Sequence, residues 1–306
     1  MSDNTIKPNP LLCDPVTGTC ELPAFDNKEL AGTAAIPGTK PLKVVYFTDP
    51  ICSSCWGIEP QLRKLKLEYG NIISIDYRMG GLLPDWSYNS GGISKPSDVA
   101  HHWDEVSAYY DMPIVGDVWL EDPLASSYPP SIAFKAAQLQ DNEKAILFLR
   151  VIREMVFLEK KNITRWEHIA AAAQYAQLEI GQFKSDYEGS AKLSFEEDLK
   201  LAREYGVRGF PSLFFEANGE KEFVYGVRPY AQYEAAVLKL HPNAAKSAYD
   251  KNTAALFSKY PSLTSKEFSE LAGIHKSETF EILHDLVLRG ILEELTTRNG
   301  SLWKWK

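Results

Sequence analysis

Hydrophobic and polar positions alternate with two different periods along this chain, and the changes of period mark its predicted elements. Residues 43–48 form a short β-branched and aromatic run, which is typical of a buried strand. The turn signal Asp49-Pro50 follows, and apolar residues then recur at helical spacing from position 56 to position 69. Residues 72–78 alternate again, so the pattern predicts strand, helix and strand in succession.

The middle of the chain is predicted to be helical. Residues 98–112 favour one helix, and from about 130 to 205 the pattern predicts helices almost without interruption. Two short strands then flank the hairpin signal Asn218-Gly219, and residues 230–240 predict a closing helix. This order predicts an α/β chain with a thioredoxin-like fold and an inserted helical subdomain at about 98–205.

Both ends of the chain lie outside this core. Residues 1–42 are rich in Pro, Gly, Asn and Asp, which predicts an irregular N-terminal segment. Residues 253–306, after a linker, predict three short helices and two short strands, the order of a small winged-helix-like domain. A helix that reads DNA is basic, whereas the charges here are balanced. We therefore expect this domain to bind protein or to form a homodimer.

Composition and charge narrow the class of protein. The 306 residues carry a net charge of −8 and are 44% hydrophobic, so a substantial core can form and general nucleic-acid binding is disfavoured. The chain has no run of 18 apolar residues, and its start lacks the basic and apolar regions of a signal peptide. We therefore expect a cytoplasmic protein without a membrane partner, in a compartment where structural disulfides are rare.

Two cysteines, Cys52 and Cys55, lie where the first strand gives way to the helix. The first turn of a helix has free N–H groups and a partial positive charge, so we expect a lowered pKa at Cys52. Its thiolate would be the nucleophile of thiol–disulfide exchange, and Cys55 is close enough to form a disulfide with it. This strand–CxxC–helix arrangement is typical of thioredoxin-like redox proteins.

The alternative for these two cysteines is half of a zinc site. Such a site needs two more ligands at comparable spacing. The remaining cysteines, Cys13 and Cys20, are separated by six residues, and no pair of histidines with the spacing of zinc ligands follows the motif. The pattern therefore favours redox chemistry, and we expect neither a metal nor another cofactor.

Cys13 and Cys20 are themselves a candidate pair. Asp14-Pro15 and Thr17-Gly18 between them favour a tight reversal that would bring the two sulfurs together. One interpretation is an auxiliary redox pair whose disulfide exchanges with the CxxC cysteines. The other, which we favour from the sequence, is two free thiols in a docked tail.

A second informative stretch is Phe210-Pro211, directly before the predicted strand 212–215. Proline is tolerated at the first residue of a strand. An aromatic residue before proline raises the share of the cis peptide bond, which is otherwise a rare and position-specific feature.

Together these motifs resemble the DsbA-like family of thiol oxidoreductases, over about residues 40–240. The matching residues are Phe47, Asp49-Pro50 before Cys52-Ser53-Ser54-Cys55-Trp56, and Gly209-Phe210-Pro211. The chain is most similar to the FrnE-like cytoplasmic branch. It is also similar, through residues 116–119, 133–137 and 160–164, to the adaptor family that delivers the regulator Spx to an ATP-dependent protease. The resemblance implies a DsbA-like domain at 43–240.

The resemblance also implies a mechanism. Cys52 attacks a partner disulfide, Cys55 resolves the mixed disulfide, and Pro211 lies against the pair and orients the partner strand. Trp56 and Phe210 are the expected substrate-binding residues. The oxidising members of the family carry Pro-His between the cysteines, so Ser53-Ser54 here implies a less oxidising pair.

Glu59 is the remaining candidate near the motif. It lies one turn after Cys55 and could tune proton transfer there. The alternative, which we favour, is a surface residue on an amphipathic helix.

Two functions follow from these observations. The first is a thiol–disulfide oxidoreductase or isomerase that acts on protein or small-molecule thiols and disulfides, and the sequence favours it. The second is an adaptor, non-catalytic or redox-gated, that recruits a client protein for regulated proteolysis. Under the second, substitution of Cys52 would leave client binding intact.

Overall fold

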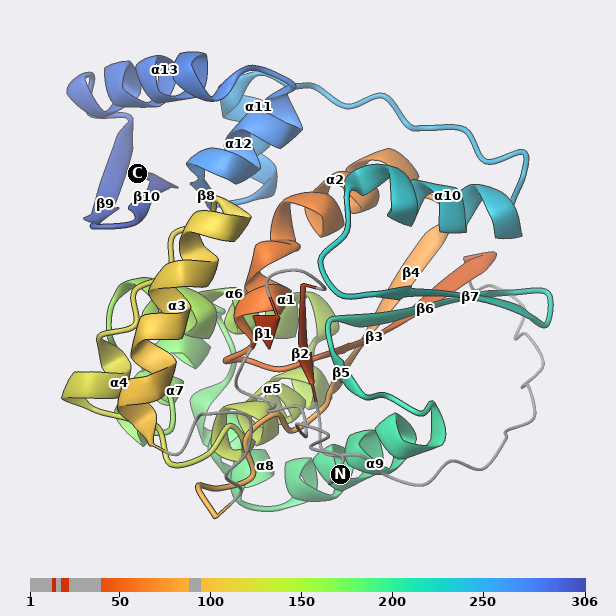
Figure 1. Cartoon of the computed structure of the whole chain (residues 1–306), viewed down its shortest axis with the longest axis vertical. Helices are drawn as coiled ribbons and strands as arrows, with labels where there is room; N and C mark the ends of the chain where they lie inside the picture. Colours follow the sequence, from red (N-terminus) through yellow and green to blue (C-terminus); the bar gives the residue numbers. More distant parts are fainter. Residues whose placement is uncertain (1–12, 15–17, 22–39, 88–94) are drawn as a thin grey trace, which may run out of the picture.

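The computed structural model describes residues 13–14, 18–21, 40–87 and 95–306 (Figure 1). At its centre lies a four-stranded sheet in the order β4-β3-β6-β7. Its strands are β3 (Leu42–Thr48), β4 (Ile73–Met79), β6 (Ser212–Ala217) and β7 (Glu220–Tyr225). β3 and β4 are parallel, whereas β3 with β6 and β6 with β7 are antiparallel. The predicted α/β class and the thioredoxin-like fold are confirmed.

The single helix predicted after β3 is wrong, because the structure has two helices there. α1 (Ser53–Gly57) ends at Ile58, and α2 (Glu59–Tyr69) begins directly after it. Pro60 accounts for the break, because proline has no N–H for a helical hydrogen bond and its ring crowds the carbonyl one turn earlier. The break leaves α1 as a short element that carries the CxxC motif.

Helices cover both faces of the sheet (Figure 1). α2 contacts α10 (Tyr230–Leu240) along one face. On the other face α9 (Ser190–Glu204) contacts β4. β3 lies between these layers, and apart from Lys43 its side chains are buried. The carboxyl end of β3, which leads into the CxxC motif, is therefore held inside the core.

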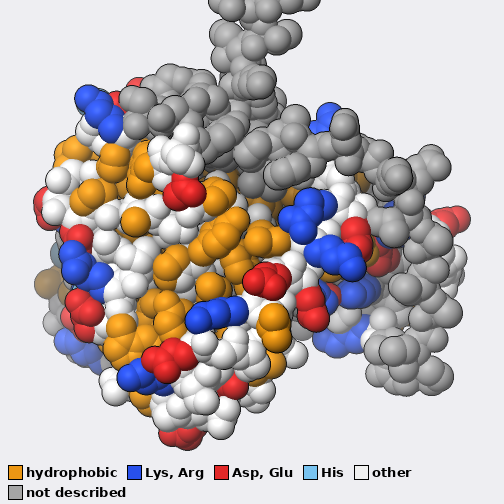
Figure 2. All heavy atoms as spheres, turned by 90° about the horizontal axis from the view of Figure 1, so that it is seen from below, with side chains coloured by type: hydrophobic (Ala, Val, Ile, Leu, Met, Phe, Trp, Pro, Cys, Tyr) orange, Lys and Arg blue, Asp and Glu red, His pale blue; other side chains and the backbone are white. Residues whose placement is uncertain are grey.

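The predicted helical insert is present between β4 and β5. Its helices are α3 (Pro96–Tyr110), α4 (Val118–Glu121), α5 (Tyr128–Gln140), α6 (Asn142–Leu158), α7 (Trp166–Tyr175), α8 (Ile180–Glu188) and α9. Seen from below, the molecule shows hydrophobic side chains at the centre of the face and charges of both signs around them (Figure 2). Within the described residues, no helix has the length and apolar character needed to cross a membrane.

A second, three-stranded sheet brings the N-terminal segment onto the body. β1 (Cys13–Asp14) and β2 (Thr19–Glu21) form a hairpin, and β2 pairs antiparallel with β5 (Gly209–Phe210). The prediction of an irregular segment is thus wrong at these positions. Strands of two or three residues show no period in the sequence, and the partner of β2 lies far along the chain. Residues 1–12, 15–17 and 22–39 lie outside the described part.

The C-terminal residues form a compact unit with its own small core. Its elements are α11 (Thr253–Lys259), β8 (Ser262–Thr264), α12 (Ser265–Ala272), α13 (Lys276–Leu288), β9 (Leu292–Thr297) and β10 (Gly300–Trp305). The strands pair in the order β8-β10-β9, and β8 is the element that the sequence did not predict. Leu263, Phe268, Leu271 and Trp303 are buried in this core. The winged-helix assignment itself stays a prediction.

Candidate functional site

The CxxC motif lies at the start of α1, as the sequence predicts. Cys52 is the N-cap residue of α1, and its Sγ accepts a hydrogen bond from the backbone N–H of Cys55 at 3.1 Å. Both thiols are free, and neither residue has any exposed surface. A reduced dithiol is therefore held at a helix N-terminus, out of contact with solvent.

The N-terminal hairpin covers this dithiol. Cys20 Sγ lies 3.5 Å from Cys52 Sγ and 3.5 Å from Ser54 Oγ, and Cys20 is fully buried. Cys20 is disulfide-bonded, so the favoured expectation of a free thiol is wrong at this position. In the hairpin register Cys13 is the residue opposite Cys20, and the side chain of Cys13 lies outside the described part. Cys20, Cys52 and Cys55 therefore lie together in one small region.

Burial changes the acidity expected of the two thiols. The pKa of Cys52 is raised, first by burial and then by the neighbouring Cys55, although the Cys55 N–H bond opposes this. Burial also acts to raise the pKa of Cys55, but the hydrogen bond with Cys52 and the charge of Arg153 outweigh it and lower that pKa. The sequence-based expectation of a lowered pKa at Cys52 is therefore wrong for this covered arrangement.

Arg153 of α6 is a residue that sequence analysis missed. Its side chain is fully buried next to the carboxyl end of β3. It donates to Glu59 Oε1 at 2.7 Å, to Thr48 Oγ1 at 2.6 Å and to the Asp49 carbonyl at 3.2 Å. The sequence does carry one signal for this residue. Arg153 is a charged residue next to Ile152 within the apolar run of a helix, where a solvent-exposed side chain is not expected. Its guanidinium provides the positive charge that acts on the CxxC pair.

Asp49 is the second buried charge at this junction. Its Oδ2 accepts hydrogen bonds from the backbone N–H of Leu82 at 2.8 Å and from the Ser127 hydroxyl at 2.8 Å. Its Oδ1 accepts from the N–H of Ile51 at 3.0 Å. Burial raises the pKa of Asp49 to about 6, because these hydrogen bonds only partly compensate the loss of water. The turn that precedes the cysteines is therefore held by hydrogen bonds to a carboxyl group whose pKa is about 6.

This pKa gives a first testable prediction. The ordinary pKa of an aspartate, 3.8, lies below the folded-state value of about 6, so the folded state takes up the proton first as the pH falls. The free energy of unfolding of the wild type, relative to that of Asp49→Asn, should therefore rise by up to about 3 kcal/mol as the pH falls from 7 to 4. Urea unfolding of both proteins across this range measures the difference. A difference that stays constant with pH contradicts the assignment.

The remaining predicted site residues near the motif are Trp56, Phe210 and Pro211. The Phe210-Pro211 peptide bond is cis, and Phe210 pairs with Cys20 across the β2–β5 ladder. Trp56 is fully buried, donates through Nε1 to the Pro113 carbonyl at 3.1 Å and stacks on Phe157. Trp56 therefore belongs to the core rather than to a partner-binding surface. Phe210 is buried as well, under β2.

Glu59 is tied to arginines rather than to the thiols. Its carboxylate bonds Arg153 at 2.7 Å and lies 3.7 Å from Arg63 Nε. It is mostly buried, with 14% of its side chain exposed, so the favoured reading of a surface residue is wrong. A carboxylate held in this way orients Arg153, and proton transfer by Glu59 stays a prediction.

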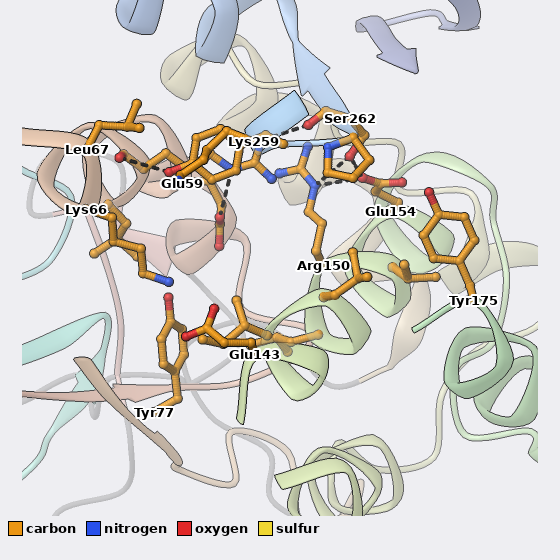
Figure 3. Close-up of a pocket in the computed structure, with 18 of the residues that line it drawn as sticks. Glu59, Lys66, Leu67, Tyr77, Glu143, Arg150, Glu154, Tyr175, Lys259 and Ser262 are labelled. Atoms are coloured by element: carbon orange, nitrogen blue, oxygen red, sulfur yellow. Dashed lines mark hydrogen bonds and ion pairs between the residues drawn. The ribbon is translucent and has the colours of Figure 1, made fainter. Parts of the chain in front are cut away.

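A separate cavity of about 370 Å³ lies between α2, α6 and the start of the C-terminal unit (Figure 3). Lys66 and Tyr77 line one side, with the Lys66 ammonium pointing toward the Tyr77 hydroxyl, and Arg150 and Glu154 of α6 line another. No cysteine is among its described lining residues. Arg150 is already paired with Glu154 and Glu267, at 2.7 and 2.8 Å, so its charge is neutralised within the protein. The cavity is therefore distinct from the dithiol.

Comparison with known proteins defines the class to which this fold and site belong. Residues 46–236 match a family model described as thioredoxin, so the chain belongs to the thioredoxin family. Among full-length relatives, the ClpXP adapter protein SpxH of Halalkalibacterium halodurans is 33% identical over 303 residues, covering 96% of both chains. SpxH of Bacillus subtilis is 29% identical over 271 residues, covering 87% of this chain and 89% of that relative.

Solved structures agree on the fold. A putative protein disulfide isomerase from Nitrosomonas europaea has a TM-score of 0.57 at 21% identity, covering 65% of this chain and 98% of that one. The cytosolic disulfide reductase DsbM from Pseudomonas aeruginosa has a TM-score of 0.53 at 20% identity, covering 65% and 99%. At this identity the likeness concerns the fold alone, and it confirms the predicted thioredoxin-like, DsbA-like body.

Proposed function

We propose that this chain is a cytoplasmic adapter that binds a client protein and delivers it to a ClpXP-type protease. One observation carries the proposal, the 33% identity that extends over 96% of both this chain and an SpxH relative. The thioredoxin match ends at residue 236, whereas this similarity also takes in the N-terminal hairpin and the C-terminal unit. The parts that the enzyme hypothesis leaves without a role are therefore shared with proteins named as adapters.

A degradation assay with purified components tests the adapter function. ClpXP and a fluorescently labelled Spx-type client are mixed with increasing amounts of this chain. We expect the initial rate of client degradation to rise at least about tenfold, because tethering raises the effective concentration of client at the protease. A labelled protein unrelated to Spx is the control. An unchanged rate at every concentration of this chain contradicts the proposal.

A second candidate function is thiol–disulfide exchange at Cys52. The observation that favours it is geometric: a free thiol at a helix N-cap lies 3.5 Å from the sulfur of Cys20, which is disulfide-bonded and pairs with Phe210 in the β2–β5 ladder. In this proposal Cys52 is the attacking nucleophile, Cys55 the resolving thiol, and Pro211 the residue that orients the partner strand. The dithiol would then act as a redox gate on the adapter.

Substitution of Cys52 by serine separates the two functions. A serine hydroxyl does not attack disulfides at neutral pH, so Cys52→Ser should lose all turnover of a disulfide-linked model peptide with glutathione. Client delivery to ClpXP should persist in the same variant. Retained peptide turnover in Cys52→Ser would show that exchange occurs elsewhere or does not involve the CxxC motif.

A further inference from the structure

The N-terminal hairpin occupies the position in which a partner strand would meet the dithiol. We infer that β1–β2 is an internal substrate: β2 is docked on β5 as an added strand, and its Cys20 disulfide accepts electrons from the Cys52–Cys55 pair. The inference rests on the second candidate function, thiol–disulfide exchange, and it names the first disulfide on which that exchange acts.

The pairing of β2 with β5 brings Cys20 of the hairpin to the site. β2 pairs antiparallel with β5, with Cys20 opposite Phe210 and Glu21 opposite Gly209. β5 ends immediately before Pro211, the residue proposed to orient a partner strand. An extended segment that adds to a free strand edge gains main-chain hydrogen bonds, and the register then decides which side chain faces the site. Here the register presents Cys20.

The hairpin is also anchored at its turn. The Gly18 carbonyl accepts a hydrogen bond from the N–H of Val227 at 2.8 Å. Gly18 has φ of +67°, and a Cβ at this position would lie 2.8 Å from both the Cβ and the backbone nitrogen of Val227. Only glycine fits both the backbone conformation and the close approach. Gly18 is therefore suited to close docking of the hairpin on the body.

The sulfur atoms of Cys52 and Cys20 are in contact. Cys52 Sγ is 3.5 Å from Cys20 Sγ, which is a contact distance for attack on a disulfide sulfur. Both residues, and Cys55, have no exposed surface. A thiol or disulfide from another molecule can reach Cys52 only after β2 has left β5. The internal disulfide is thus the one that Cys52 meets in this arrangement.

The exchange balances within the chain. The chain has four cysteines, and Cys52 and Cys55 are free, so we assign the second sulfur of the Cys20 disulfide to Cys13, the residue opposite Cys20 in the hairpin register. When the Cys52 thiolate attacks Cys20 Sγ, a Cys52–Cys20 bond forms and the Cys13 sulfur leaves as a thiolate that takes up a proton. Cys55 then attacks Cys52 Sγ, which releases Cys20 as a thiol and leaves a Cys52–Cys55 disulfide. Two electrons pass from the CxxC pair to the hairpin pair, so no external oxidant or reductant is needed.

The Cys55→Ser variant of the full chain traps the first step. The variant keeps the hairpin disulfide and Cys52 but has no resolving thiol. It is incubated without added thiol or oxidant at pH 8, quenched with acid, alkylated, digested and analysed by mass spectrometry. We expect a peptide in which Cys52 is disulfide-linked to Cys20, with Cys13 alkylated. Mixing ¹⁵N-labelled and unlabelled protein before incubation shows that the link forms within one chain.

Two further variants provide controls. Cys55→Ala tests whether the trapped link depends on the serine rather than on the missing thiol, and it should give the same linked peptide. Gly18→Ala, added to Cys55→Ser, removes no further sulfur but disturbs docking against Val227, and it should slow formation of the link several-fold.

The result that overturns the inference is an intact hairpin disulfide with Cys52 alkylated in both Cys55 variants, or a link only between differently labelled chains. If the wild type nevertheless turns over an external disulfide peptide, thiol–disulfide exchange stands and only the internal substrate is lost. If that turnover is absent as well, both the inference and the exchange function fail.

Discussion

Replacing Arg153 by methionine is expected to lower the free energy of unfolding by about 3 kcal/mol. The guanidinium is fully buried and bonds the Glu59 carboxylate, the Thr48 hydroxyl and the Asp49 carbonyl. Methionine fills a similar volume but leaves these acceptors without their donor, and removing one partner of a buried ion pair costs far more than removing an exposed one. The effect should reach the thiols as well, because Arg153 lowers the pKa of Cys55.

Urea unfolding under reducing conditions measures this change, with Arg289→Met as the matched control. Arg289 pairs with Asp285 on the exposed side of α13, where both side chains are 62% exposed, so its loss should change stability by less than about 1 kcal/mol. NMR titration of the Cys55 Cβ signal should show a higher pKa in Arg153→Met than in the wild type. Equal stability of the two variants would mean that Arg153 does not hold the junction.

Replacing Glu267 by alanine should loosen the C-terminal unit from the body, with a loss of about 3 kcal/mol or more. Glu267 is fully buried and accepts two hydrogen bonds from Arg150 of α6, at 2.8 and 2.9 Å, while Arg63 Nε of α2 lies 3.3 Å away. It also accepts from the N–H of Thr264 in the capping box of α12. Alanine removes the acceptor and leaves two buried arginines short of their counter-charge.

Amide hydrogen exchange in β8 and α12 measures the loosening. A loss of 3 kcal/mol corresponds to an increase in exchange of roughly a hundredfold, whereas amides of β3 should change little. The matched control is Glu270→Ala in the same helix, because Glu270 pairs with Lys266 at 2.8 Å and is 34% exposed. Similar exchange in the two variants would show that Glu267 does not secure the interface.

The parts of the fold that sequence predicted well are those set by local patterns. The run of β3, the CxxC junction, and the order of elements from β6 to α10 each depend on residues close together in the chain. The C-terminal end of α2 and both ends of α10 could likewise be placed from periodicity alone. These predictions needed no knowledge of which segments meet in space.

The parts that sequence did not predict depend on contacts between distant residues. Burial of Cys52 under β2 reverses the pKa expected from its helix position, because loss of water outweighs the helix N-terminus. Arg153 appears in the sequence as one more charge on a helix, and only the fold shows that it is enclosed beside Thr48 and Asp49. Trp56 next to the motif suggested a partner surface, yet its ring is enclosed by Phe157 and Pro113.

The pairing of β2 with β5 also has a consequence for how the chain is made. Cys20 emerges from the ribosome long before Phe210, its partner in the ladder, and at ordinary rates of synthesis the interval is about 10–40 s. Throughout that time β2 has no edge to join, and the CxxC thiols of the nascent chain stay uncovered. The covered arrangement is therefore a property of the finished polypeptide, and chains truncated before position 209 would carry a reactive dithiol exposed to the cell.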